Sequence, residues 1–238
     1  MYQRALAAAA ASGDPAYGGY LVAVSLGHLA LHCGDPETAL AWARRAEGVL
    51  GTAASPGTRA AVTAVSARAL ARMGREAETT RVLLACERLL ERAGTGDEPR
   101  WIAYFNRAYL ADEVAHCLHD LGRAPAARSA AENALEGVGA SRVRRLALDA
   151  TLLASAWLRS GDVEQACAAA GDGVRYTART SSGRCRERIR QLLGDLSRYR
   201  DVACVRELED LVCQILPDAF VIPRGWPGRS RVPPGAPG

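Results

Sequence analysis

Four short glycine turns recur at similar intervals along the chain: Cys33-Gly34-Asp35, Met73-Gly74-Arg75, Leu121-Gly122-Arg123 and Ser160-Gly161-Asp162. The glycines lie 40, 48 and 39 residues apart. A helix commonly ends at a residue in the left-handed conformation, which glycine adopts at little cost. Asp35 and Asp162 can cap the helix that follows, and Pro36 suits its first turn. The repeat therefore predicts helical hairpins, each with a glycine between its two helices.

Small residues stand at fixed distances from each turn glycine. Seven residues before it are Gly27, Ala67, Ala115 and Ala154. Five residues after it are Ala39, Thr79, Ala127 and Ala166, and twelve after it are Ala46, Cys86, Ala134 and Gly173. Helices approach closely only where such side chains meet, and a spacing of seven keeps them on one helical face. The pattern predicts that each helix packs a stripe of small residues against its partner.

Composition agrees with an all-α fold. The chain is 49% apolar but only 5% aromatic, so its core must come from Ala, Leu and Val on many closely packed helices. We expect four hairpins within residues 15–180, at 15–50, 56–93, 99–136 and 141–177. Two capping helices are expected within 181–216, and a disordered Pro/Gly/Arg-rich tail at 217–238. Residues 1–14 read as the remnant of a preceding repeat.

The pattern small-x6-Gly-[Asp/Arg]-x3-Ala-x6-Ala, clearest over residues 27–46 and 154–173, resembles the tetratricopeptide repeat. The resemblance implies a right-handed superhelical array of antiparallel hairpins, an α-solenoid. The large aromatic of the first helix is replaced by small residues, namely Ala23, Thr63, Ala111 and Ala150. The units also exceed the usual length of roughly 34 residues. The resemblance is therefore to a divergent, long-helix form.

The alanine-rich repeats, residues 97–105 and the ending Val205-Arg206-Glu207-Leu208 resemble the C-terminal region of actinobacterial helix-turn-helix transcriptional regulators of the XRE type. In that family a DNA-reading domain precedes a sensor or dimerisation region built of tetratricopeptide repeats. No helix-turn-helix is visible here. The resemblance implies a regulatory interaction module, and the chain looks like the C-terminal portion of a longer array.

The histidines do not form a metal-binding pattern. His28 and His32 are four residues apart and His116 and His119 are three apart, spacings at which two imidazoles can share an ion. The two pairs belong to the first and third hairpins, so we expect no common metal site. We interpret these residues as solvated or hydrogen-bonded histidines.

Catalytic motifs are also missing from the sequence. It contains no Gly-rich phosphate loop, nucleophile elbow or HExxH. Asp112 and Glu113 are adjacent, so on a helix they point about 100° apart and do not share a face. We therefore expect a protein that is not an enzyme and that needs no cofactor.

Charge and cysteine usage limit the partners and the compartment. All 30 basic residues are arginine, and two clusters occur, at 142–145 and at 184–200. Side chains spaced two apart scatter around a helix instead of tracking phosphates. We therefore interpret both clusters as solvated faces, with a weak anionic contact as the alternative, and expect no direct nucleic acid binding. The seven cysteines include no CxxC pair and are expected to be free thiols. With neither a signal peptide nor a membrane span, a cytoplasmic location is expected.

The position six residues before each turn glycine is polar in every hairpin: His28, Arg68, His116 and Ser155. In tetratricopeptide arrays this position faces the concave groove. Helical spacing adds Tyr109, Asp112 and His119, and places Ala61, Ala64 and Thr151 on the same faces. Arg68 and His116 are predicted to clamp a carboxylate or carbonyl, with Asp112 raising the proton affinity of His116.

The sequence therefore predicts a non-catalytic module that binds a protein or peptide segment in this groove and can form a homo-oligomer, without contacting a membrane. Two alternatives remain open. The chain is a DNA-binding regulator in its own right, or it is a degenerate remnant without a partner.

Overall fold

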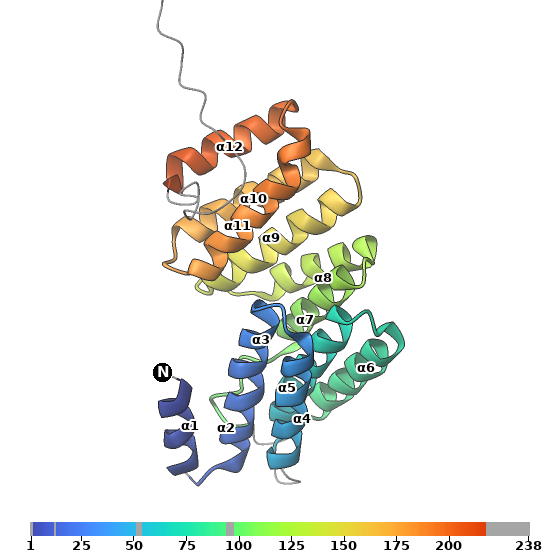
Figure 1. Cartoon of the computed structure of the whole chain (residues 1–238), viewed down its shortest axis with the longest axis vertical. Coiled ribbons are helices and arrows are strands. Elements are labelled where there is room, and N and C mark those ends of the chain that lie inside the picture. Colours follow the sequence, from blue (N-terminus) through green and yellow to red (C-terminus); the bar gives the residue numbers. More distant parts are fainter. Residues whose placement is uncertain (1, 12, 51–53, 94–97, 218–238) are drawn as a thin grey trace, which may run out of the picture.

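The computed structural model describes residues 2–11, 13–50, 54–93 and 98–217, and over these ranges the chain is helical and contains no strand. The helices follow one another in chain order from one end of the molecule to the other (Figure 1). None of the helices in these ranges is both long enough and apolar enough to span a bilayer. The predicted tail lies outside the described residues except for its first position.

The helices form consecutive antiparallel pairs. Their bounds are α1 Tyr2–Ala11, α2 Pro15–Tyr20, η1 Leu21–Gly27, α3 His28–His32, α4 Pro36–Leu50, α5 Pro56–Arg72, α6 Glu76–Ala93, α7 Arg107–Asp120, α8 Ala124–Gly137, α9 Val143–Arg159, α10 Val163–Ala178, α11 Gly183–Leu196, η2 Ser197–Tyr199 and α12 Ala203–Ile215. The closest packing joins α5 to α6, α7 to α8 and α9 to α10. Successive pairs then stack, since α5 also packs on α7 and α9 on α11.

The turn glycines have the predicted conformation. Gly34, Gly74, Gly122 and Gly161 have φ angles of 79°, 72°, 75° and 86°. Asp162 caps α10 by accepting a hydrogen bond from the Gln165 amide at 2.9 Å. Asp35 accepts one from the Thr38 amide at 3.0 Å. Each turn thus ends one helix and begins the next, as the sequence predicts.

The stripe of small residues lies at the helix crossings. Ala67, Ala115 and Ala154 are fully buried. A Cβ added to Gly27 would come within 2.6 Å of Val65 Cγ1, and one added to Gly173 within 2.8 Å of Thr151 Oγ1. The predicted repeat register is therefore confirmed.

Two local features differ from the expected hairpins. The first helix of the first pair is interrupted by the π-helical segment η1, which resets the helical register just before His28. The third pair begins at Arg107, not at residue 99. Residues 98–106 instead form turns that bury Ile102 and Phe105, and Asn106 caps α7 by accepting a hydrogen bond from the Tyr109 amide. An early start of the helix would lift these two apolar side chains out of the core.

The last two helices cover the end of the stack. Ile189, Leu192 and Leu196 of α11 and Val205, Leu208 and Val212 of α12 pack against α9 and α10 in one buried cluster. The other face of α11 carries arginines, and it lies beside α3 and α5 across a cleft.

Candidate functional site

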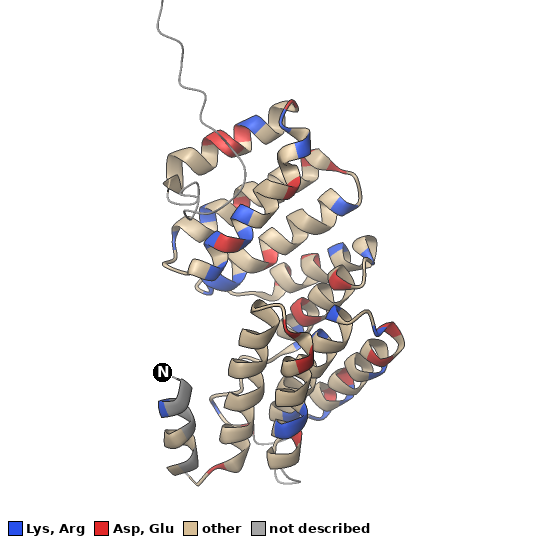
Figure 2. Ribbon diagram, viewed as in Figure 1, with Lys and Arg blue, Asp and Glu red and all other residues tan. Residues whose placement is uncertain are grey.

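A cleft of about 920 Å³ opens between the first helices of the stacked pairs. Its walls come from η1, α3, α5, α7, α9, the 137–145 connection and the start of α11. Figure 2 shows arginines along α11, including the end nearest α3. The cleft is therefore formed by elements far apart in the sequence, and its chemistry depends on how their charges are balanced.

One ion pair closes the floor of the cleft. Arg68 Nη1 on α5 donates a hydrogen bond to Glu113 Oε2 on α7 over 3.0 Å, and both side chains are 3% exposed. His28 Nε2 lies 3.7 Å from Glu113 Oε1. Burial is the largest single effect on the pKa of Glu113 and raises it, but Arg68, His28 and Arg145 together outweigh burial and lower the pKa. Glu113 is therefore charged and fully committed to Arg68.

A second set of charges lies between α7 and α9. Arg145 Nη2 is 2.7 Å from Asp112 Oδ2, and Arg145 Nε donates to Asp149 Oδ2 over 3.0 Å. Burial and the neighbouring Asp112 carboxylate raise the pKa of Asp149, whose other oxygen has no hydrogen-bond partner within the described residues. The two carboxylates thus contact the same arginine, and the raised pKa leaves Asp149 protonated at neutral pH. This group adds no net charge to the cleft.

Aromatic rings line another part of the wall. Tyr104 and Tyr109 border the cleft, with ring centroids 4.9 Å apart. The Tyr104 hydroxyl lies 2.5 Å from that of Tyr20 on α2. The rings of Trp101 and Tyr17 form a T-shaped contact. Arg145 places its guanidinium 3.9 Å from the Tyr109 ring centroid. The wall therefore combines flat apolar surface with a cation held over it.

Arg184 and Arg188 of α11 contribute charge that nothing balances. Arg184 lines the cleft and Arg188 lies beside it. Neither forms an ion pair with any residue that the structure describes. Burial, followed by the nearby Arg68, lowers the pKa of Arg184 and lowers that of Arg188 to about 10. The expected solvated face on α11 is therefore wrong for these two arginines, which are partly buried and repel one another.

His28 and His116 both have lowered pKa values, contrary to the prediction for His116. Its Nε2 lies 3.4 Å from Asp112 Oδ1, the predicted partner. Burial, together with Arg68, Arg188 and Arg184, nevertheless lowers its pKa well below 6.5. Burial likewise lowers the pKa of His28 to about 4. The Asp112 carboxylate fails to raise the proton affinity because Arg145 already neutralises it.

Five of the seven predicted groove residues line the cleft: His28, Arg68, Tyr109, Asp112 and His116. His119 and Ser155 do not. The Ser155 hydroxyl donates to the Thr151 carbonyl of its own helix at 3.0 Å, and His119 lies near Asp120. Ala61, Ala64 and Thr151 are buried in the core.

Several residues of the cleft were not singled out from the sequence. Glu113 was dismissed with Asp112 as a pair on different faces, yet each carboxylate meets a guanidinium from a different helix. Arg184 and Arg188 belong to a run in which arginine recurs every second residue, and this spacing predicts side chains scattered around the helix. Their spacing of four, like that of Arg145 and Asp149, places both on one helical face. That spacing was the signal available in the sequence.

The described residues offer no set of three or more His, Cys, Asp or Glu side chains that could hold a metal ion. The acidic side chains of the cleft are neutralised by arginine or by a proton. What the arrangement can do is accept a negatively charged or aromatic group. No protein family, curated protein or solved structure matches this chain.

Proposed function

We propose that the chain is a non-catalytic binding protein that takes an acidic protein or peptide segment into the cleft. The observation that carries this proposal is the pair Arg184 and Arg188, partly buried beside Arg68 without a carboxylate of their own. A buried charge without a partner destabilises the fold, and an anionic ligand removes that cost. The aromatic wall supplies contact area for an extended segment.

The finer features of the proposal come from the repeat. We propose that the stacked hairpins form a tetratricopeptide-like superhelical array and that the cleft is its concave groove. The stacking of α5 on α7 and of α9 on α11 supports this arrangement. The resemblance to helix-turn-helix regulators adds the proposal that binding serves transcriptional regulation in the cytoplasm.

Double-stranded DNA is the less favourable partner. Binding to a duplex requires arginines in a stripe on an accessible surface, where they follow the phosphates. Here the arginines converge on a recess of about 920 Å³, a volume in the range of pockets for small ligands or short segments. A narrow chain can enter this space.

Fluorescence anisotropy with labelled peptides of about ten residues tests the proposal. A Glu/Tyr peptide is expected to bind at least about tenfold more tightly than Ser/Tyr or Arg/Tyr peptides. Arg142→Gln with Arg144→Gln, two exposed arginines at the cleft rim, should weaken this binding and its salt dependence. The matched control is Arg81→Gln with Arg88→Gln on the exposed face of α6, away from the cleft.

Equal affinity for the three peptides would rule out the acidic-segment proposal. A salt-sensitive gel shift with genomic DNA at near-physiological ionic strength, abolished by the rim variant, would favour the DNA-binding alternative.

A further inference from the structure

A smaller pocket adjoins the main cleft between α3, α5 and α11. It measures about 160 Å³ and is lined by His32, Arg68, Arg72, Arg184, Glu187 and Arg188, together with Leu31, Gly34 and Gln191. His32, Arg68 and Arg184 border both spaces. At about 30 Å³ per water, the pocket has room for about five waters, enough for one tetrahedral oxyanion.

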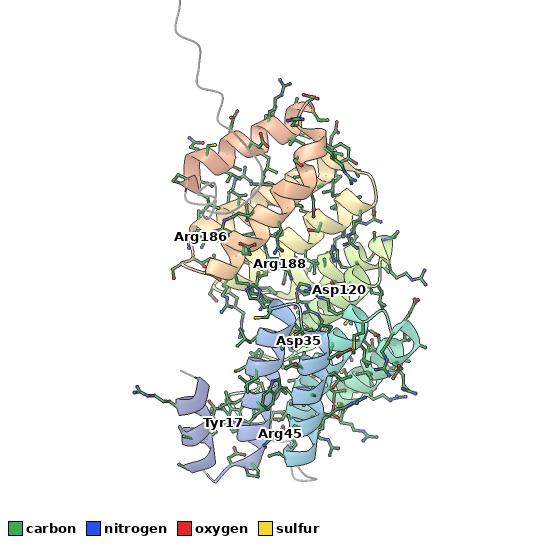
Figure 3. The ribbon with its side chains drawn as sticks, in the orientation of Figure 1. Tyr17, Asp35, Arg45, Asp120, Arg186 and Arg188 are labelled. Atoms are coloured by element: carbon green, nitrogen blue, oxygen red, sulfur yellow. The ribbon has the colours of Figure 1, made fainter. Side chains whose placement is uncertain are left out.

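The charges that face this pocket leave an excess of two. Glu113 pairs with Arg68 at 3.0 Å, and Asp120 pairs with Arg72 at 3.1 Å. Glu187 pairs with Arg190, one turn further along α11. Arg184 and Arg188 remain without an acid among the residues that the structure describes. Asp120 lies near Arg188 in Figure 3 but is committed to Arg72.

Donor atoms in the walls also lack partners. Arg68 is 2% exposed, and its Nε has no hydrogen-bond partner within the described residues although Nη1 is bound to Glu113. The buried Nε of Arg184 also has no hydrogen-bond partner within the described residues. Buried donors are normally satisfied, so unsatisfied ones on two walls of one pocket indicate a missing acceptor.

We propose that this pocket binds a phosphate group, held by Arg184 and Arg188 against Arg68. Phosphate carries between about 1.5 and 2 negative charges at pH 7, which matches the excess, whereas a carboxylate would neutralise half of it. Guanidinium groups also match phosphate oxygens in pairs. The inference deepens the proposed function and rests on it for one source of the group, a phosphorylated side chain of the segment in the main cleft. A free phosphorylated small molecule presents the same chemistry.

Isothermal titration calorimetry of the full chain with sodium phosphate, sodium sulfate and sodium acetate at pH 7.5 tests the pocket. Phosphate and sulfate should bind, and acetate should bind at least about tenfold more weakly. On lowering the pH to 5, phosphate affinity should fall, because inorganic phosphate is mostly a dianion at pH 7.5 and a monoanion at pH 5. Sulfate stays a dianion over this range, so its affinity should not fall.

Arg184→Gln with Arg188→Gln should reduce phosphate affinity at least about tenfold. The matched control is Arg186→Gln with Arg206→Gln. It changes one arginine of α11 and one of α12, and neither lines either pocket. Arg186 lies on α11 apart from Arg188 in Figure 3. Circular dichroism melts should show that the double variant remains folded, because it removes two mutually repelling charges.

Two peptides that differ only in one phosphoserine separate the sources. A phosphopeptide that binds more tightly than both its parent and free phosphate identifies a phosphorylated segment, and equal affinity of phosphopeptide and phosphate identifies a small molecule. Equal binding of acetate and phosphate, or unchanged binding in the Arg184/Arg188 variant, would overturn the phosphate pocket while leaving acidic-peptide binding intact. Phosphate binding without any preference for acidic peptides would instead overturn the proposed function alone.

Discussion

Arg68 and Glu113, separated by 45 residues in the sequence, form a 3.0 Å ion pair in which each residue is only 2% exposed. The pair joins α5 to α7, and Glu113 lies on the same turn of α7 as Asp112, which joins α7 to α9 through Arg145. Two successive residues of one helix thus hold the helices on both sides of it. The stacking of the pairs is therefore fixed by charge as well as by small side chains.

Glu113→Gln should destabilise the protein by about 3 to 5 kcal/mol, because it leaves the buried Arg68 charge without a partner. Urea denaturation monitored by circular dichroism measures the change. The control is Glu76→Gln, which breaks the exposed pair of Glu76 with Arg123 and should leave the midpoint unchanged. Arg68→Met with Glu113→Leu should recover most of the loss. A midpoint for Glu113→Gln equal to that of the control would contradict the buried pair.

Ala154→Leu should cost about 1 to 3 kcal/mol, because Ala154 is fully buried at a helix crossing and a larger side chain overpacks it. Ala168→Leu, on the exposed face of α10, is the control and should have little effect. Thermal melts of both variants give the comparison. An unchanged melting temperature for Ala154→Leu would mean that the small residue is not required at this crossing.

Asp149→Asn should stabilise the protein more at pH 8 than at pH 5. The pKa of Asp149 is raised from 3.8 to about 9 in the fold, so the folded state binds a proton that the unfolded state releases. Stability from this group is complete below pH 3.8 and is lost as the pH rises towards 9. Asparagine stays neutral and lacks this dependence. Equal shifts in melting temperature at both pH values would show that Asp149 is not protonated in the fold.

The cysteines should react in the order of their exposure. All seven are free thiols, with Cys33 and Cys213 exposed and Cys86 and Cys117 buried. Burial also raises the pKa of Cys86 to about 12, which keeps it as the unreactive thiol. Iodoacetamide labelling followed by mass spectrometry should modify Cys33 and Cys213 first, and the other two only after unfolding. Intramolecular disulfides in protein handled without oxidant would contradict this expectation.

The hairpins could be predicted from the sequence because their determinants are local. A turn glycine such as Gly161 and a small residue such as Ala154 act within one pair, and their spacing is visible in the chain. The balance of charge could not be predicted in the same way. The pKa of His116 is lowered first by burial and then by Arg68, Arg188 and Arg184, and the last two approach it only through the packing of α11 on α9. The spacing of residues within one hairpin does not indicate that α11 will bring Arg184 and Arg188 close to His116.

The conformation of the aromatic segment that precedes α7 could not be predicted from the sequence. Trp101, Tyr104 and Phe105 fit a helical period as well as a turn. The turn is favoured by partners elsewhere in the chain. The Tyr20 hydroxyl contacts that of Tyr104, and the Gly57 amide donates a hydrogen bond to the Glu98 carboxylate at 2.9 Å. A helix through this segment would break those contacts.

The contact between the Tyr20 and Tyr104 hydroxyls spans 84 residues, whereas most helix pairs join neighbours in the chain. Contacts of long sequence separation form late, since the intervening chain must be ordered first, while a hairpin can nucleate by itself. We therefore expect the single pairs to fold early and the cleft to assemble in the last kinetic phase. A ligand that recognises the completed cleft would then distinguish the finished protein from every partly folded intermediate.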